Sequence, residues 1–243
     1  MSAPKRFLTE NIIDYPKSGE VELEGEQFNH AKNVLRLSVG AEITLLDGSG
    51  REYSAIIAAC GKRSMTAHIT GFTVGDKEPK TKVRLLCGAL KGDKTELIVQ
   101  KATELGVSEI GVFQSRYCSA YMNGNKLERL KKVAKEAAKQ CLRARVPEIS
   151  YYEDFSSALE SCKGFENKLF ACEFARESDA DVSALKGGCA LIVGSEGGFS
   201  EEEFLQAKAD GFAGVTLGKR ILRAETAAIA FLSVVMFSLG ELR

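Results

Sequence analysis

The chain has 243 residues, and its 33 basic and 33 acidic side chains leave a formal net charge of zero. This length allows one large domain or two small ones with a sizeable core, and the bulk charge does not by itself indicate a nucleic-acid-binding protein. Seven cysteines without a Cys-x-x-Cys pair argue against a disulfide framework or a zinc site, and two histidines are too few for a histidine-rich metal site.

The cysteine usage favours a reducing compartment. The first residues lack the apolar core of a signal peptide, and no apolar stretch reaches the roughly 18 residues that span a bilayer. We therefore expect a cytoplasmic protein without a bound metal or a membrane contact.

Residues 1–73 have the pattern of a small β unit. Two strands within residues 42–59 flank an Asp-Gly-Ser-Gly turn, a third strand is expected over residues 65–72, and a short helix over residues 29–37. Several short strands in so few residues indicate a small barrel. The polar, charged stretch 74–82 contains Pro79 and is interpreted as a linker, which leaves residues 83–243 as a second domain.

Residues 83–243 alternate between strands and helices. Strands are predicted over 83–90, 109–113, 168–172, 189–193 and 213–217, and helices over 93–105, 126–141 and 227–239, with one more starting at Ser200. Asp93 with Glu96, and Ser200 with Glu203, have the spacing of capping boxes. This alternation is typical of an α/β domain with a mainly parallel sheet and helices on both faces. The last helix is apolar almost all round, so it must be buried on several sides, in the core or against another chain.

Two of these strands end in turns that suggest a ligand site. Residues 189–193 lead into Gly194-Ser-Glu-Gly-Gly-Phe-Ser200, and residues 213–217 lead into a loop that carries Arg223 and Glu225. We expect the two strand–loop–helix units to lie side by side and to form a crevice at the carboxyl ends of the sheet. The turns match neither a P-loop nor a dinucleotide fingerprint, and Glu196 favours a neutral or cationic ligand. The alternative is a glycine turn that only connects strand and helix.

At residues 194–200 and 217–227 the chain resembles the ribosomal RNA small-subunit methyltransferase E family. Further similar blocks are residues 91–107, residues 136–140 and residues 146–149. Members are SPOUT-class enzymes that methylate N3 of a uridine in 16S rRNA with S-adenosylmethionine. The resemblance implies a PUA-like RNA-binding barrel in residues 1–73, a SPOUT methyltransferase domain in residues 83–243 whose last helix forms a trefoil knot, and a homodimer.

The resemblance also implies roles for residues of the two turns. The cationic sulfonium of the cofactor fits a carboxylate at Glu196. Arg223 would stabilise negative charge on the uracil oxygens and Glu225 would be a nearby proton acceptor, although a local salt bridge between the two is an equal alternative. The expected cofactor cradle consists of Gly194, Glu196, Gly197, Gly198, Leu217, Gly218, Ile221, Leu222 and Ala227.

RNA contacts are expected from basic residues in both domains. The candidates are Arg6, His30, Lys32, Arg36, Lys91 and Arg116. His30 could equally be a half-buried structural histidine. Residues 126–145 carry eight basic and two acidic side chains, which fits either phosphate contact or the solvated face of a helix.

Four positions depart from the pattern of the family. Asn29 and Asn33 stand where a histidine and an arginine are usual, Ser195 where proline is common, and Ala224 where threonine is common. Two alternatives therefore stay beside rRNA uridine-N3 methylation: a SPOUT enzyme that acts on another RNA such as tRNA, and a non-catalytic RNA-binding ribosome-assembly factor. The nucleotide, the assembly stage of the substrate and the residue that accepts the N3 proton are left open.

Overall fold

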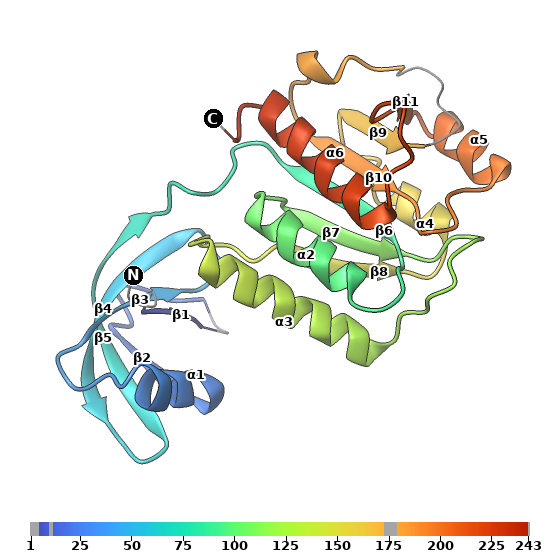
Figure 1. The fold of residues 1–243 in the computed structure, drawn as a ribbon. Helices are drawn as coiled ribbons and strands as arrows, with labels where there is room; N and C mark the ends of the chain where they lie inside the picture. The colour runs from blue at the N-terminus through green and yellow to red at the C-terminus, as the bar shows by residue number, and fades with distance from the viewer. Residues whose placement is uncertain (1–4, 10–11, 173–178, 243) are drawn as a thin grey trace. The chain divides into compact units, whose positions relative to one another are not determined.

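The computed structural model describes residues 5–9, 12–172 and 179–242. The chain forms two compact units (Figure 1). The first comprises Met1–Glu78 and Ala138–Val146, and the second comprises Pro79–Ala137 and Pro147–Arg243. Residues 138–146, which comprise the end of the helix predicted over 126–141 and the segment after it, thus belong to the first unit.

The first unit is a curled five-stranded sheet. Its strands are β1 (Arg6–Leu8), β2 (Glu20–Glu24), β3 (Glu42–Leu46), β4 (Arg51–Cys60) and β5 (Ser64–Val74), in the order β1-β3-β4-β5-β2. Side chains alternate between the two faces, so Tyr53, Ala55 and Ile57 of β4 point into one core with Phe7 and Met65. Only β1 and β3 run parallel; the other neighbours are antiparallel.

The helix of this unit begins earlier and is less regular than the sequence predicts. Instead of one helix over 29–37, α1 (Gly25–Asn29) continues into a π-helical turn, η1 (His30–Val34). Arg36 then takes a positive φ of 52°, which a helix cannot continue through. The predicted helix is therefore displaced toward the N-terminus and ends early.

The second unit contains a six-stranded sheet in which all neighbours are parallel. The strands are β6 (Val83–Gly88), β7 (Glu109–Phe113), β8 (Glu148–Tyr152), β9 (Asn167–Ala171), β10 (Cys189–Val193) and β11 (Ala213–Val215), in the order β11-β9-β10-β6-β7-β8. Every residue of β10 is buried, as expected for a strand covered on both faces. The parallel sheet predicted from the alternating pattern is confirmed.

Helices cover the two faces of this sheet. They are α2 (Lys94–Glu104), α3 (Gly124–Gln140), α4 (Phe155–Glu160), α5 (Glu201–Ala209) and α6 (Ala224–Ser238), with a short 3-10 turn, η2 (Val182–Ala184). Alternate residues of β10 serve different faces: Ala190 and Ile192 join the cluster under α4 and α5. Helix α6 packs with α2 over β6 and β10 (Figure 1). None of the helices in the described ranges is long and apolar enough to cross a membrane.

The course of α6 is unusual for an α/β sheet. It follows the edge strand β11 but contacts the central strands β6 and β10. Its buried side chains include Phe231, Leu232 and Val235, whereas Val234 and Phe237 are exposed. A last helix that returns to the middle of the sheet is the element order that a knotted domain requires, and the threading itself stays a prediction.

Candidate active site

The site lies at the carboxyl edge of the parallel sheet. Because all six strands run the same way, the loops that follow β6, β7, β10 and β11 emerge at this one edge. The predicted adjacency of the two glycine-turn units is wrong, since β9 lies between β10 and β11 and pairs with both. The two turns are brought together by side chains instead.

The first turn, residues 194–198, is packed too closely for side chains at two of its glycines. A Cβ at Gly197 would lie 2.6 Å from the Tyr117 Cβ and 2.7 Å from the Tyr117 carbonyl oxygen, and one at Gly194 would lie 2.8 Å from the Phe199 ring. Gly198 has a φ of 68° and its N–H donates to the Ser195 carbonyl at 3.0 Å. Only glycine therefore fits at residues 194 and 197, where the turn packs against Phe199 and Tyr117.

Gly88, the last residue of β6, packs against the backbone of this turn. A Cβ at Gly88 would lie 2.5 Å from the Ser195 backbone nitrogen. The Ser195 hydroxyl is buried and has no hydrogen-bond partner among the described residues. Such an atom is costly to bury unless a ligand or water satisfies it. The sequence analysis missed Gly88 because no motif surrounds it.

One ammonium group joins the two turns. The Lys94 Nζ donates to the Glu196 Oε1 at 3.0 Å and lies 3.9 Å from the Glu225 Oε2, while the Lys91 backbone N–H donates to the same Glu196 oxygen at 3.3 Å. Burial raises the pKa of Glu196, but the hydrogen bonds from Lys94 and from backbone N–H groups outweigh it and hold the pKa below its usual value. Glu196 is therefore a carboxylate at neutral pH.

Glu225, like Ser195, carries a buried oxygen without a hydrogen bond in the described part of the chain. Its Oε2 is buried and accepts no hydrogen bond from the described residues. Within the same residues it makes no ion pair with Arg223, so the predicted local salt bridge is not formed. Arg223 is exposed and occupies the N-cap position of α6 without a side-chain cap. Both predicted catalytic side chains are thus uncommitted to each other.

The second turn offers apolar surface beside a flexible backbone. Gly218 has a φ of 103°, and Ile221 is 91% exposed. Leu217, Leu222 and Ala227 are half-buried. An almost fully exposed isoleucine beside a glycine is a surface that an apolar ligand part can cover.

Arg116 lies on the loop after β7 and is tied to the start of α5. Its N–H donates to the Glu203 Oε1 at 2.8 Å, and its guanidinium pairs with Glu202. The Glu203 Oε2 accepts from the Ser200 N–H and the Ser200 hydroxyl accepts from the Glu203 N–H, so the predicted capping box is confirmed. This loop contacts the glycine turn through Tyr117, which the sequence analysis did not single out.

The RNA candidates of the first unit differ in availability. Arg6 is buried and donates to both oxygens of Glu52, at 2.9 and 3.0 Å, which favours a structural role. His30 is exposed and its ring lies 6.0 Å from that of Phe7. Lys32 donates to the Gly61 carbonyl at 3.0 Å, and Arg36 is exposed.

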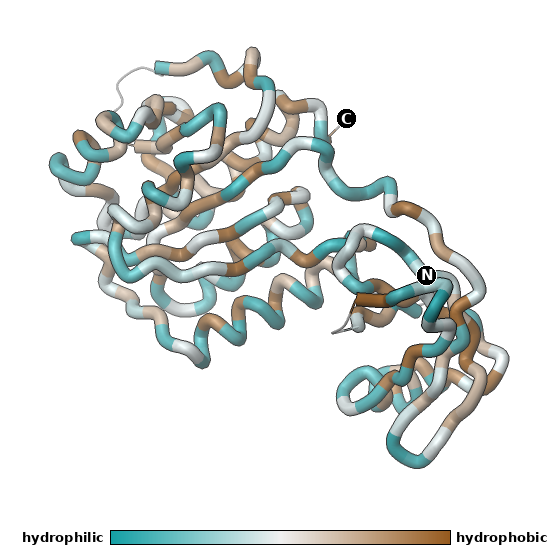
Figure 2. The backbone as a smooth tube through the Cα atoms, turned by 180° about the vertical axis from the view of Figure 1, so that it is seen from behind, coloured by the Kyte–Doolittle hydropathy of each residue, from teal (hydrophilic) through white to brown (hydrophobic). Residues whose placement is uncertain are grey.

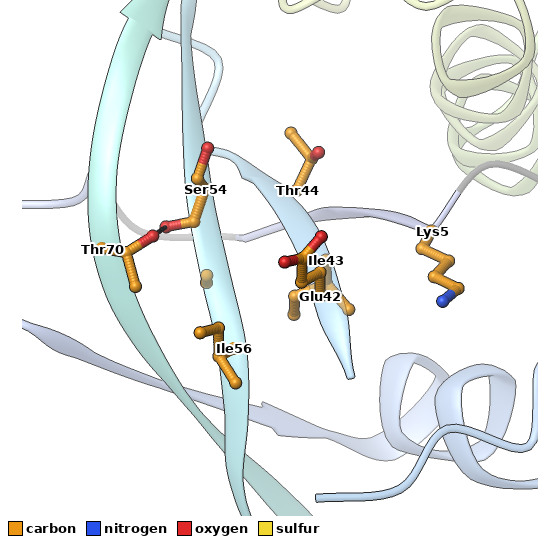
Figure 3. A pocket seen from close by; sticks show the side chains of 8 residues that line it. Lys5, Glu42, Ile43, Thr44, Ser54, Ile56 and Thr70 are labelled. Atoms are coloured by element: carbon orange, nitrogen blue, oxygen red, sulfur yellow. Dashed lines mark hydrogen bonds between the residues drawn. The ribbon is translucent and has the colours of Figure 1, made fainter. Parts of the chain in front are cut away.

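A hollow of about 390 Å³ lies in the first unit (Figure 3). Lys5 and Glu42 bring opposite charges to it, and the Thr70 hydroxyl donates to the Ser54 carbonyl at 3.1 Å. Within the described ranges no group of histidine, cysteine and carboxylate side chains could hold a metal. The candidate catalytic and cofactor-binding residues lie at the sheet edge of the second unit.

The basic run of residues 126–145 is partly consumed by internal contacts. Arg129 pairs with Glu96 at 2.8 Å, so the capping box predicted from Asp93 and Glu96 is wrong: Glu96 binds a neighbouring helix, and Asp93 makes no side-chain cap. Lys131 pairs with Glu128 at 2.8 Å. Lys132 and Lys135 have no ion-pair partner among the described residues. Hydrophilic and hydrophobic residues alternate along α3 (Figure 2).

Comparison with known proteins gives a uniform result. Residues 76–236 match the model of an RNA methyltransferase domain, and residues 23–70 match an RNA methyltransferase PUA domain. The ribosomal RNA small subunit methyltransferase E of Bacillus subtilis is 31% identical over 233 residues, which cover 91% of each chain. That of Mesomycoplasma hyopneumoniae is 39% identical over 162 residues, 65% of this chain and 71% of the relative.

Solved structures agree with these matches. The ribosomal RNA small subunit methyltransferase E of Neisseria gonorrhoeae bound to S-adenosyl methionine superposes with a TM-score of 0.88 at 30% identity, over 97% of this chain and 98% of that chain. A Legionella pneumophila methyltransferase in complex with the same cofactor gives a TM-score of 0.86 at 29% identity, over 97% and 98%. The glycine turns described above thus lie in a fold that holds this cofactor in two other proteins.

Proposed function

The chain belongs to the ribosomal RNA small subunit methyltransferase E family, and we propose that it transfers the methyl group of S-adenosylmethionine to N3 of a uridine in 16S rRNA. Two relatives of the same fold are solved with this cofactor. The observation in this chain that carries the proposal is the pair of turns at one sheet edge, joined by Lys94 and lined by unsatisfied polar atoms.

The residues present fit the cofactor. Gly194 and Gly197 let the turn pack directly against Phe199 and Tyr117, where any side chain would collide, and this packing fixes the shape of the turn. The buried Ser195 hydroxyl can donate a hydrogen bond to a ligand or accept one from it, and the buried Glu225 Oε2 can accept one, since neither has a hydrogen-bond partner among the described residues. Ile221 offers apolar surface to an adenine or ribose face. Glu196, Glu225 and Lys94 sum to one negative charge, which suits a cationic sulfonium.

Bound at these residues, the cofactor would supply an electrophilic methyl group on its sulfonium. The turns contribute by orientation, because they hold one reactant rigidly and expose one face of it. Arg223 is exposed at the start of α6 and can place positive charge beside the uracil oxygens, where negative charge develops as N3 loses its proton. In this proposal Glu225 accepts that proton, since its Oε2 accepts no hydrogen bond from the described residues and lies 3.9 Å from the Lys94 ammonium.

The substrate is a large RNA, and both units contribute contacts to it in this proposal. His30 and Lys32 lie on η1 and Arg36 lies just after it, while Lys91 and Arg116 lie on loops at the sheet edge. Basic side chains in these places position the phosphate backbone rather than read sequence. The departures at Asn29 and Asn33 remove two expected side chains; Asn33 donates instead to the Asn29 side chain.

We also propose that the active form is a cytoplasmic homodimer. Val234 and Phe237 are 46% and 55% exposed on a helix whose Phe231, Leu232, Val235 and Met236 are buried. A second copy that covers them would bury apolar surface otherwise in contact with water. Light scattering tests this, and a monomer at micromolar concentration would exclude it.

The function is tested by methylation of unmodified small ribosomal subunits with labelled S-adenosylmethionine. Label at N3 of a 16S rRNA uridine supports the proposal. Cofactor binding with label only in another RNA, such as tRNA, supports the second enzyme hypothesis. Binding of RNA without binding of cofactor supports an assembly factor. Arg223→Ala and Glu225→Gln are expected to lower kcat by about a hundredfold or more while the cofactor still binds.

A further inference from the structure

Among the described residues, Lys94 pairs both with Glu196 of the first turn and with Glu225, which lies at the start of α6 directly after the second turn. It hydrogen-bonds Glu196 of the first turn at 3.0 Å and lies 3.9 Å from Glu225 at the start of α6. Its own side chain is about one third exposed, and that of Glu225 is 12% exposed. This ion pair is therefore partly shielded from water, which strengthens it relative to a surface pair.

The sheet does not set the spacing of the two turns directly. The strands that lead into them, β10 and β11, are separated by β9 and share no hydrogen bonds. The second turn, residues 216–223, is a long irregular connection that ends in α6. Because Lys94 pairs with both Glu196 and Glu225, it sets the distance between the first turn and the start of α6, which strand pairing does not set.

The position of Lys94 is unfavourable by local rules. It is the first residue of α2, where the helix dipole disfavours a positive charge and favours a negative one. The preceding Asp93 does not cap the helix with its side chain. Attraction to the Glu196 and Glu225 carboxylates offsets this cost. In return, the ammonium reduces the repulsion between the two carboxylates.

We propose that Lys94 is a positioning residue of the methyltransferase site, which holds the glycine turn and the start of α6 at the spacing the cofactor needs. The proposal rests on the proposed function for its ligand. The ammonium also reduces two carboxylate charges to a net charge of minus one, complementary to one sulfonium. Removing it leaves two like charges that push the turns apart.

The test compares Lys94→Gln and Lys94→Arg in the full chain. Lys101→Gln is the matched control, since Lys101 lies on the same helix and pairs with Glu104 alone at 2.9 Å. Calorimetry measures S-adenosylmethionine affinity, and hydrogen exchange measures protection of residues 194–198 without cofactor. Lys94→Gln should raise Kd about tenfold and speed exchange in the turn. Lys94→Arg should keep the cofactor affinity and the exchange rate of the turn close to those of the wild-type chain. Lys101→Gln should change neither the affinity nor the exchange rate.

The double variant Lys94→Gln/Glu196→Gln separates positioning from simple loss of an ion pair. Removing one of the facing carboxylates relieves the repulsion, so its exchange in the turn should be slower than in Lys94→Gln alone. Unchanged affinity and exchange in Lys94→Gln would overturn the proposal, as would a double variant that exchanges faster still. If the wild-type chain binds no cofactor, the proposed function fails, while the exchange data still decide whether Lys94 fastens the turns.

Discussion

At the scale of single residues, the candidate site depends on glycines at positions where no side chain fits. Gly88, Gly194 and Gly197 each lie where a methyl group would collide with a backbone or ring atom within 3 Å. The loops after β6, β7 and β10 can approach each other only because these positions lack side chains. The glycine turn is therefore shaped by its neighbours as much as by its own sequence.

Gly197→Ala is expected to weaken S-adenosylmethionine binding by about tenfold or more, because the added Cβ forces Tyr117 and the turn apart. Gly124→Ala is the control: nothing lies within 4 Å of its Cβ, and it begins α3. The control should leave affinity unchanged and leave stability equal or raise it by up to about 1 kcal/mol. Equal affinity in both variants, measured by calorimetry, would contradict the close packing of the turn.

Asp47 is a buried carboxylate whose role is to stabilise the fold of the first unit. It is 7% exposed and accepts from the Ser49 N–H at 2.9 Å, the Ile13 N–H at 3.0 Å and the Tyr53 hydroxyl at 3.1 Å. Burial raises the pKa of Asp47, but these hydrogen bonds outweigh it and hold the pKa below its usual value of 3.8. Because the folded pKa is the lower one, ionised Asp47 stabilises the fold above the unfolded pKa.

This stabilisation is lost as the pH falls through the lowered pKa. Asp47→Asn should therefore reduce the free energy of unfolding at pH 7 by about 1–3 kcal/mol, with a smaller difference from wild type near pH 3. Urea unfolding at the two pH values measures this. Asp76→Asn, whose side chain is 91% exposed, is the control and should match wild type. A constant difference at both pH values would show that the Asp47 charge is not responsible.

At the scale of elements, the capping box of α5 does two jobs. Ser200 and Glu203 cap the helix, and the Glu203 Oε1 also holds the Arg116 N–H. The cap is local to the helix, whereas the bond to Arg116 fixes the loop that contacts Gly197. The two functions can therefore be separated by mutation.

Ser200→Ala should lower stability by about 1 kcal/mol through loss of the cap, with cofactor affinity unchanged. Glu203→Ala should lower both, because it also frees the loop that carries Tyr117. Thermal unfolding and calorimetry on the same samples measure the two effects. If Ser200→Ala weakened cofactor binding as much as Glu203→Ala, the Arg116 contact would not be the cause.

Local patterns predicted elements well, and long-range pairings decided the rest. The Ser200–Glu203 box forms because both partners lie within one helical turn and no stronger partner competes. The similar Asp93–Glu96 pattern fails because Arg129, distant in sequence, takes the Glu96 carboxylate. The strand β8 was missed, since its half-buried serine and tyrosines lack a continuous apolar run.

The candidate site was predicted in its residues but not in its geometry. The glycines, Glu196 and Glu225 stand out in the sequence, and the structure brings Glu196 and Glu225 to one ammonium. Strand order cannot be read from periodicity, so the insertion of β9 between β10 and β11 was unforeseen. Lys94 was overlooked because it sits inside a pattern interpreted as a helix cap.

At the scale of the whole molecule, a net charge of zero conceals an uneven distribution. Helix α3 carries an excess of lysines, and its apolar residues Leu130 and Ala134 are buried. Lys132 and Lys135 are three residues apart and thus share one side of the helix. Unlike Arg129 and Lys131, they have no carboxylate partner among the described residues.

We predict that these two lysines contact phosphate, and the loss of such contacts would change RNA binding measurably. Each contact that is lost lowers the dependence of log K on log salt by about one unit, because one fewer counterion is released. Lys132→Glu/Lys135→Glu should therefore weaken binding to small-subunit rRNA by about tenfold or more at low salt, with a shallower salt slope and unchanged cofactor affinity. Lys163→Glu is the matched control, since Lys163 follows α4 and pairs with Glu160. Filter binding over a range of salt concentrations measures both slopes. Equal slopes for the double variant, the control and the wild-type chain would mean that this face of α3 is only a solvated helix surface.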